Sequence, residues 1–266
     1  MADTALADPY LPVPARIIAA REELPGVVTL ESTLDAADGR AFAPGQFHML
    51  YAFGNGEIPV SISGDPAETS RLIHTIRAVG AVSEALTRLG PGAVMGLRGP
   101  YGEPWPVETA RGRHLIIVSG GLGLAPLRPA LLAARARRGD LAGLDLVHGA
   151  RSPADLLYPD QVEAWGADPG LDVSLTVDAA GRDWTGNVRT VPALLERRLR
   201  GCNPANVTAF LCGPEIMMRI GARALAAAGV PISEIWLSLE RNMKLSLIHI
   251  SEPTRPFTLS RMPSSA

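Results

Sequence analysis

The chain of 266 residues has little of what defines several large protein classes. Its two cysteines, Cys202 and Cys212, are too few for a disulfide framework and favour a reducing, cytoplasmic compartment. No apolar run reaches the length of a membrane-spanning helix. Asp3 and Asp8 stand where a secretory signal would have basic residues, so we expect no signal peptide. A formal net charge of −2 gives no electrostatic reason to expect nucleic acid or an anionic membrane as partner.

Patterns of acid–base or metal-dependent catalysis are also scarce. The five histidines are scattered without the spacing of metal ligands, so we interpret each as a surface or core residue and expect no metal site. We see no paired carboxylates and no nucleophile–histidine pattern. What the chain does have is 47% hydrophobic and 20% charged residues, which is typical of an ordered protein, over a length that accommodates two domains.

Up to about Val107 the sequence consists of short strand-like segments separated by glycine and proline. Val27–Ser32 alternates apolar and polar residues, as a half-buried strand does. We expect one short helix, Ser83–Leu89. The other expected strands are Gln46–Tyr51, Pro59–Ser63, Arg71–Arg77 and Val94–Arg98. Short strands at regular spacing predict an antiparallel barrel or sandwich over residues 10–107.

From His114 onward, strands alternate with helices. His114–Val118 is an apolar run typical of a strand buried on both faces. A helix is predicted over Leu127–Ala134, with Pro126 and Pro129 in its first turn and Gly139 as its cap. The later strands and helices are expected at Leu144–Val147, Val173–Val177, Val207–Leu211 and Ile235–Leu239, and at Val191–Arg198 and Glu215–Ala228. This alternation predicts a parallel sheet over residues 113–240, with the domain boundary at 107–113.

Three loops of the second half follow predicted strands. Ser119–Pro126 is rich in glycine and precedes a helix, where free amides attract phosphate, although a purely structural turn is an equal alternative. Cys212–Met218 also joins a strand to a helix; Cys212 by itself is more often a small core residue. His148–Ser152 follows the next strand, where an adenosine ribose or its 2′-phosphate would bind.

Six segments, in register along residues 10–244, resemble the ferredoxin–NADP reductase superfamily. They are Pro44–Phe47, Ile58–Ser63, Gly80–Ser83, Gly99–Gly102, Gly120–Gly123 and Cys212–Glu215. The resemblance is greatest to the FAD- and NAD(P)-binding gamma subunits of cytosolic nickel–iron hydrogenases and sulfhydrogenases, with the electron-transfer subunit of dihydroorotate dehydrogenase as a relative. It implies a flavin-binding barrel, a nucleotide-binding α/β domain, and iron–sulfur, hydrogenase-type partner subunits.

The resemblance also assigns residues to each cofactor. Ser61, beside the flavin N5, and Cys212 and Glu215, beside the nicotinamide, are the residues it places at the reaction. The residues implied to bind FAD are Pro59, Val60, Ser61, Ile62, Ser63, Gly80, Val82 and Ser83. Those implied to bind NAD(P) are Gly120, Gly121, Gly123, Arg151, Ser152, Gly213 and Pro214. Ile58 and Val60 stand where many members have arginine and tyrosine, a departure that the hydrogenase-type relatives share.

After Lys244 the composition changes. Leu245–Ala266 has no glycine, and it stands where members of the family have a cysteine cluster that binds a [2Fe–2S] centre. We interpret this tail as a non-native replacement of that segment; a divergent natural tail is the alternative.

The leading hypothesis is a subunit that moves electrons between NAD(P)H and an iron–sulfur partner through FAD. A stand-alone flavin or ferredoxin reductase and a non-catalytic nucleotide-binding module are the alternatives.

Overall fold

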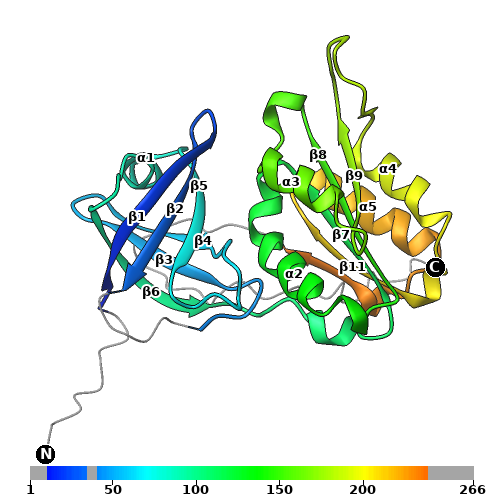
Figure 1. The fold of residues 1–266 in the computed structure, drawn as a ribbon, viewed down its shortest axis with the longest axis horizontal. Coiled ribbons are helices and arrows are strands. Elements are labelled where there is room, and N and C mark those ends of the chain that lie inside the picture. Colours follow the sequence, from blue (N-terminus) through cyan, green and yellow to red (C-terminus); the bar gives the residue numbers. More distant parts are fainter. Residues whose placement is uncertain (1–10, 35–40, 239–266) are drawn as a thin grey trace, which may run out of the picture. The chain divides into compact units, whose positions relative to one another are not determined.

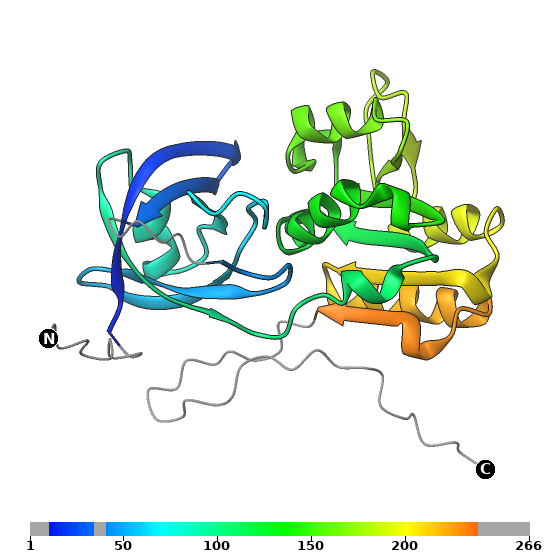
Figure 2. The ribbon, with the colours of Figure 1, turned by 60° about the horizontal axis from the view of Figure 1, so that its bottom comes forward.

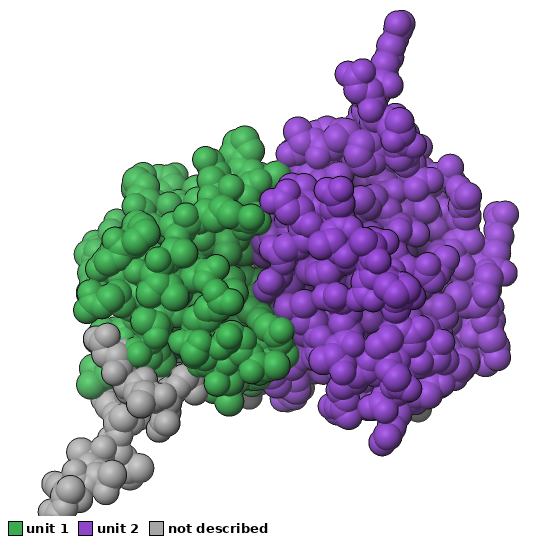
Figure 3. Space-filling view, viewed as in Figure 1, with its two compact units in different colours: residues 1–42, 46–101 green, residues 43–45, 102–266 purple. Residues whose placement is uncertain are grey.

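A computed structural model describes residues 11–34 and 41–238 of the chain. The chain divides into two compact units (Figure 3). The first ends at Tyr101, and the second comprises the residues from Gly102 onward together with Ala43–Gly45. This division falls several residues before the interval 107–113 that the sequence indicated. The predicted tail, Leu245–Ala266, lies outside the described residues.

The first unit is a six-stranded antiparallel sheet with one short helix (Figures 1 and 2). Its elements are β1 (Val13–Leu24), β2 (Val27–Leu34), β3 (Phe47–Ala52), β4 (Gly56–Ser61), β5 (Leu72–Arg77), α1 (Ala81–Thr87) and β6 (Val94–Tyr101). The strand order is β4-β3-β6-β1-β2-β5. The two outermost strands approach each other where Ile62 bridges to His74 and the Ser63 amide donates to the Ile73 carbonyl at 2.9 Å. The predicted antiparallel barrel is therefore confirmed.

Alternate residues of these strands point inward and fill the barrel. Ile17, Leu30, Leu50 and Leu97 come from four different strands and are at most 1% exposed. Burying each such side chain contributes about 1.5–3 kcal/mol. A small group of buried polar residues, which includes His48, His74 and Thr75, shares this interior.

The longest strand of the barrel, β1, was missed by the sequence analysis. Its segment contains Ala19, Ala20, Arg21 and two glutamates, which favour a helix or a loop more than a strand. Antiparallel pairing with β2 on one side and β6 on the other holds it extended, and its register shifts twice along β2. Tertiary pairing here outweighs local preference.

The second unit is a six-stranded sheet in which every pairing is parallel, in the order β10-β9-β8-β7-β11-β12. The strands are β7 (His114–Gly120), β8 (Gly143–Ala150), β9 (Asp172–Val177), β10 (Asn187–Val188), β11 (Val207–Cys212) and β12 (Ile235–Ser238). The helices are α2 (Leu124–Ala136), α3 (Pro159–Gly166), α4 (Val191–Leu199) and α5 (Glu215–Ala227). The predicted parallel sheet is confirmed.

Helices cover both faces of this sheet (Figures 1 and 2). Ile116 and Val118 of β7 pack with residues of α4 and α5 on one face. The inner side of α2, which includes Leu127 and Leu131, is fully buried, and the helix contacts β7, β8 and β11. Burial on both faces explains why β7 is an uninterrupted apolar run. Among the described residues, no helix is long and apolar enough to cross a membrane.

Two details of α2 correct the sequence-based expectation. The helix begins at Leu124, so Pro129 lies inside it rather than in the first turn. A proline has no amide hydrogen, so the helix loses one backbone hydrogen bond at this position. The Pro129 ring is buried, and its packing offsets this loss. Gly139 does not cap the helix: α2 ends at Ala136, and Gly139 lies in the following 3-10 turn, Arg138–Asp140. The sequence pattern also predicted neither α3 nor β10.

Candidate functional site at the carboxyl edge of the parallel sheet

The strand order of the second unit changes direction between β7 and β11. Proceeding along the chain from β7, the strands β8 and β9 add on one side, and β11 and β12 lie on the other. In open parallel sheets, ligands bind outside the carboxyl ends of the strands at this switch point. The register aligns Cys212 of β11 with Ser119 of β7, and Ser119 with His148 of β8. The three loops that the sequence singled out thus leave the same edge.

The loops after β7 and β11 pack directly against each other, and glycine makes this contact possible. A Cβ atom on Gly123 would lie 2.3 Å from the Cys212 carbonyl oxygen, and one on Gly213 would lie 2.9 Å from the Gly120 amide nitrogen. A Cβ on Gly120 would lie 2.5 Å from the Met217 sulfur. Gly123 and Gly213 are therefore required for loop–loop packing, whatever they bind, whereas Gly120 packs against the Met217 side chain of α5.

Gly121 differs from its neighbours. Its φ of +53° lies in the left-handed region, and a Cβ there would have no atom within 4 Å. It begins a 3-10 turn, Gly121–Gly123, that leads into the 13-residue helix α2. The first amides of a helix have no partner within it, and the helix dipole makes this end electropositive. The backbone at Gly121 is thus open beside a helix N-terminus.

The residues of the second loop occupy contrasting environments. Cys212 is 5% exposed and ends β11, so its side chain belongs to the core of the sheet while its carbonyl faces Gly123. Pro214 and Glu215 are exposed, and Glu215 is the first residue of α5. Of the two residues assigned to the reaction in this unit, only Glu215 presents its side chain to solvent.

A buried polar pair lies beneath these loops; its two residues begin two of the loops that the sequence singled out, but neither was given a role. The Ser119 hydroxyl lies 2.8 Å from His148 Nδ1, and both residues are fully buried. Burial lowers the pKa of His148 to about 4, so the ring is neutral near pH 7. Each residue directly precedes a glycine near the carboxyl end of its strand, but the sequence could not indicate that the two side chains meet.

The loop after β8 holds Arg151 and Ser152. Arg151 is exposed. The Ser152 hydroxyl donates to the Asp155 carboxylate at 2.6 Å, which places an acidic group three residues from the arginine. Asp155 was not predicted as part of this site.

In the barrel, the predicted flavin segment Pro59–Ser63 divides into two parts. Pro59, Val60 and Ser61 belong to β4 and are half-buried. Ile62 and Ser63 are fully buried, and the Ser63 hydroxyl lies 3.3 Å from the Ile73 carbonyl oxygen and 3.2 Å from the Thr75 hydroxyl. Only the first part is partly exposed, and within it Val60 also packs against the barrel core.

The second predicted flavin segment, Gly80–Ser83, forms the N-terminal turn of α1. The Ser83 hydroxyl accepts from the amides of Val79 at 2.9 Å and Gly80 at 3.0 Å. Ser83 is 5% exposed. The hydroxyl therefore stabilises the turn, and the amides of Ala81 and Val82 remain at the open end of the helix.

The motif Pro44–Phe47 is shared between the two units. Gly45, with φ +99°, lies against Trp105 of the second unit, where a Cβ would be 2.8 Å from the indole ring. The Trp105 amide donates to the Pro44 carbonyl at 2.7 Å, and its ring stacks on Phe210 of β11 at a centroid distance of 5.0 Å. The close packing against Trp105 thus explains why glycine occupies position 45.

Comparisons with known proteins agree with this architecture. The family described as "Oxidoreductase NAD-binding domain" matches residues 117–223. The gamma subunit of sulfhydrogenase 1 of Pyrococcus furiosus is 32% identical over 216 residues, covering 80% of this chain and 73% of the relative. Ferredoxin–NADP reductase B of Sorangium cellulosum is 32% identical over 244 residues, covering 86% of this chain and 97% of the relative.

The fold is also found among solved structures. A ferredoxin NADP+ reductase from Neisseria gonorrhoeae with bound FAD and NADP superposes with a TM-score of 0.69 at 19% identity, covering 87% of this chain and 94% of that one. The identity, coverage and shared architecture together show that this chain belongs to the ferredoxin–NADP reductase superfamily.

Proposed function

We propose that this chain is an FAD-dependent oxidoreductase that moves electrons between NAD(P)H and an iron–sulfur partner such as a hydrogenase-type subunit. The relatives support this proposal, since one is named as a sulfhydrogenase subunit and another as a ferredoxin–NADP reductase. The observation that carries it is the open backbone at Gly121, beside a helix N-terminus and in one of the two loops that pack together at the switch point.

The carboxyl edge of the parallel sheet fits a dinucleotide. Gly121 leaves room for a phosphate to approach its backbone, and Gly120, Gly123 and Gly213 hold the adjoining loops in place. Arg151 and Ser152 would bind the adenosine end. Gly213 and Pro214 would border the nicotinamide, with Cys212 beneath it and Glu215 at the rim.

The barrel fits a flavin through two segments. The half-buried Pro59, Val60 and Ser61 would line the ring, and the amides of Val82 and its neighbours would bind the pyrophosphate. Ile62 and Ser63, inside the barrel, would fix the backbone at the end of β4. Ser83 would fix the backbone of the turn before α1. When bound, FAD supplies the exchange between two-electron hydride chemistry and single electrons. The protein's own contribution is binding, orientation and exclusion of water.

The nucleotide site can be tested with one variant and a matched control. Gly121→Val fills the open space and strains a positive φ, so we expect loss of NAD(P)H oxidation with flavin still bound. Gly112→Val places the same side chain at φ +73°, also with no atom within 4 Å, but at the amino edge of the sheet before β7. It carries the same backbone strain and should keep nucleotide oxidation.

Steady-state oxidation of NADH and NADPH and the flavin absorbance of both variants decide the outcome. If Gly121→Val loses flavin yet still binds nucleotide, the assignment of the two units is reversed. Equal activity in both variants would remove the proposed phosphate site.

The ferredoxin–NADP reductase relative, matched over 97% of its length, favours a second candidate, a reductase without a fixed partner. Hydrogenase genes beside this gene would support the subunit; their absence, with full activity toward free ferredoxin, would support the reductase. A folded preparation that stays colourless with excess FAD would contradict both and leave a non-catalytic nucleotide-binding module.

A further inference from the structure

A second cluster of reactive side chains lies at the opposite, amino edge of the parallel sheet. His114 begins β7, Asp145 lies near the start of β8, and Cys202 follows α4 just before β11. Their nitrogen, oxygen and sulfur atoms all lie within 4.8 Å of one another. Nothing in the proposed electron transfer uses them. Because the three residues are far apart in the sequence, their spacing gave no sign of a site.

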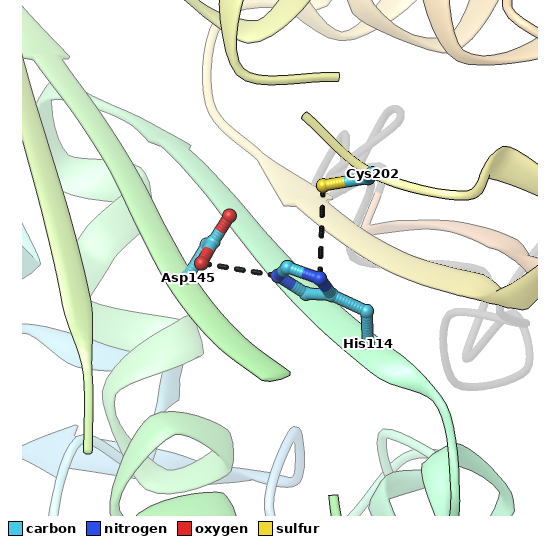
Figure 4. A group of neighbouring side chains, drawn as sticks. All are labelled: His114, Asp145 and Cys202. Atoms are coloured by element: carbon cyan, nitrogen blue, oxygen red, sulfur yellow. Dashed lines mark hydrogen bonds and ion pairs between the residues drawn. The ribbon is translucent and has the colours of Figure 1, made fainter. Parts of the chain in front are cut away.

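The histidine ring stands between the other two residues and presents a different nitrogen to each (Figure 4). His114 Nε2 lies 3.0 Å from Asp145 Oδ1, and His114 Nδ1 lies 3.6 Å from Cys202 Sγ. A carboxylate beside Nε2 favours the tautomer with its proton there, which leaves the Nδ1 lone pair directed at the sulfur. In metal sites, carboxylates orient histidines from this side of the ring; here Nε2 and Oδ1 are at ion-pair distance but outside the angles of a hydrogen bond.

Asp145 is held in place for this role. It is 1% exposed, and Arg198 of α4 contacts both of its oxygens, at 2.5 and 2.9 Å. The two Arg198 contacts fix the carboxylate while it faces the imidazole.

The Cys202 thiol lies near two hydrogen-bond acceptors but has only one proton to donate. Its single proton faces both His114 Nδ1 and the Arg198 carbonyl oxygen, which lies 3.7 Å from the sulfur. The thiol can therefore donate to only one of these two acceptors at a time.

We propose that His114 Nδ1 and Cys202 Sγ bind a thiophilic divalent cation such as Zn²⁺, with Asp145 as the orienting carboxylate. A zinc ion bonded to sulfur at about 2.3 Å and to nitrogen at about 2.0–2.1 Å, at the tetrahedral angle, separates these atoms by about 3.5–3.6 Å. The observed separation is 3.6 Å. Sulfur and imidazole ligands select zinc over magnesium or calcium.

The charges of the cluster also suit a dication. Asp145 and Asp172 are paired with Arg198, which leaves one net negative charge. Binding breaks the S–H bond, forms the sulfur–metal bond and releases the proton to solvent. The thiolate adds a second negative charge, so the bound ion makes the cluster neutral. His114 and Cys202 are half-buried, which leaves the remaining coordination positions to water.

Cobalt(II) titration of the untagged, full-length chain tests this site, because a thiolate ligand gives cobalt a charge-transfer absorption. We expect one thiolate-bound cobalt per chain, displaced by Zn²⁺, with one proton released. Cys202→Ser and His114→Gln should each abolish the thiolate band or weaken binding at least about tenfold. The matched control Cys212→Ala, which alters the other cysteine of the chain, should retain both.

Metal-free thermal unfolding with a chelator shows whether each variant is folded. Cys202 is half-buried, so its serine variant should unfold at the wild-type temperature without metal. The absence of a thiolate band in the wild type would overturn the proposal. So would a band that survives Cys202→Ser, or one that only Cys212→Ala removes.

Discussion

Burial fixes the protonation state of His74 in the barrel. The residue is fully buried, and its Nε2 lies 2.9 Å from Nδ1 of His48, which is also fully buried. Removal from water lowers the pKa of His74 to about 3, from an ordinary value of 6.5. The ring stays neutral in the folded barrel at pH values where an unfolded chain would already be protonated.

The stability of the barrel should therefore fall in mild acid. Between pH 6.5 and about 3 the unfolded state binds a proton at His74 that the folded state does not, so folding loses up to about 1.4 kcal/mol per pH unit. Hydrogen exchange of β2 and β5 at pH 7.5 and pH 5 measures this loss locally. The His74→Gln variant should show a flatter pH dependence; an unchanged slope would assign the acid sensitivity to other groups.

Arg151 is the residue whose role in coenzyme choice is most open to test. Its exposed guanidinium suits a 2′-phosphate, whereas Asp155, bonded to Ser152 nearby, would repel one. The fixed charge and planar donors of the guanidinium favour NADP(H). Arg151→Ala should then raise the KM for NADPH more than that for NADH, by about tenfold for one lost charged hydrogen bond. An equal change for both coenzymes would identify Arg151 as a solvated surface charge.

At the scale of elements, α1 shows how a short helix is held in place. Ser83 accepts from two amides of the preceding turn, at 2.9 and 3.0 Å, and is itself almost fully buried. Ser83→Ala removes both bonds and should cost about 0.5–2 kcal/mol of stability. Because this turn carries the proposed pyrophosphate amides, FAD affinity should also fall. Fluorescence titration of the flavin-free barrel with FAD measures the change, and Ser83→Thr, which keeps the hydroxyl, should recover most of the affinity.

The elements that the sequence predicted share a strong local pattern, and those it missed do not. The apolar run of β7 and the glycines after it were sufficient to predict a buried strand and a loop. The helix α3 begins after Tyr158, which adopts a left-handed φ of 55°, and it buries only Val162 and Trp165, too few to establish a helical period. For β1, pairing with two neighbouring strands outweighs a helix-favouring composition.

The sequence was sufficient to predict which loops form the candidate site. It did not predict which residues of each loop pack against the protein and which are open to a ligand. Sequence could indicate that Gly120–Gly123 lies between a strand and a helix. It could not indicate that Gly123 meets the Cys212 carbonyl while Gly121 faces open space, because that depends on how β11 pairs with β7. The same holds for Ser63, whose hydroxyl contacts β5 rather than facing outward.

At the scale of the whole molecule, the barrel and the parallel sheet would each supply one cofactor site of the proposed reductase, and its one-electron exit would need an iron–sulfur cluster. A [2Fe–2S] cluster is usually held by four cysteines, and this chain has two. Cys212 ends β11 and Cys202 precedes its start, so the two lie at opposite edges of the sheet. We therefore expect no cluster to be ligated by this chain alone.

This deficit gives a prediction for the intact chain. With FAD bound it should oxidise NAD(P)H and reduce small dyes, because both steps need only the two cofactor sites. Its iron content should be negligible, and electron delivery to a hydrogenase-type partner should be slow. Iron analysis with parallel dye and partner assays measures each point, and iron near two atoms per chain would contradict the prediction.

Sequencing the source gene beyond codon 244 tests whether the tail replaced a cluster-binding segment. Closely spaced cysteine codons are expected there. The codons for Leu245–Ala266 followed by a stop in genomic DNA would instead make the tail native.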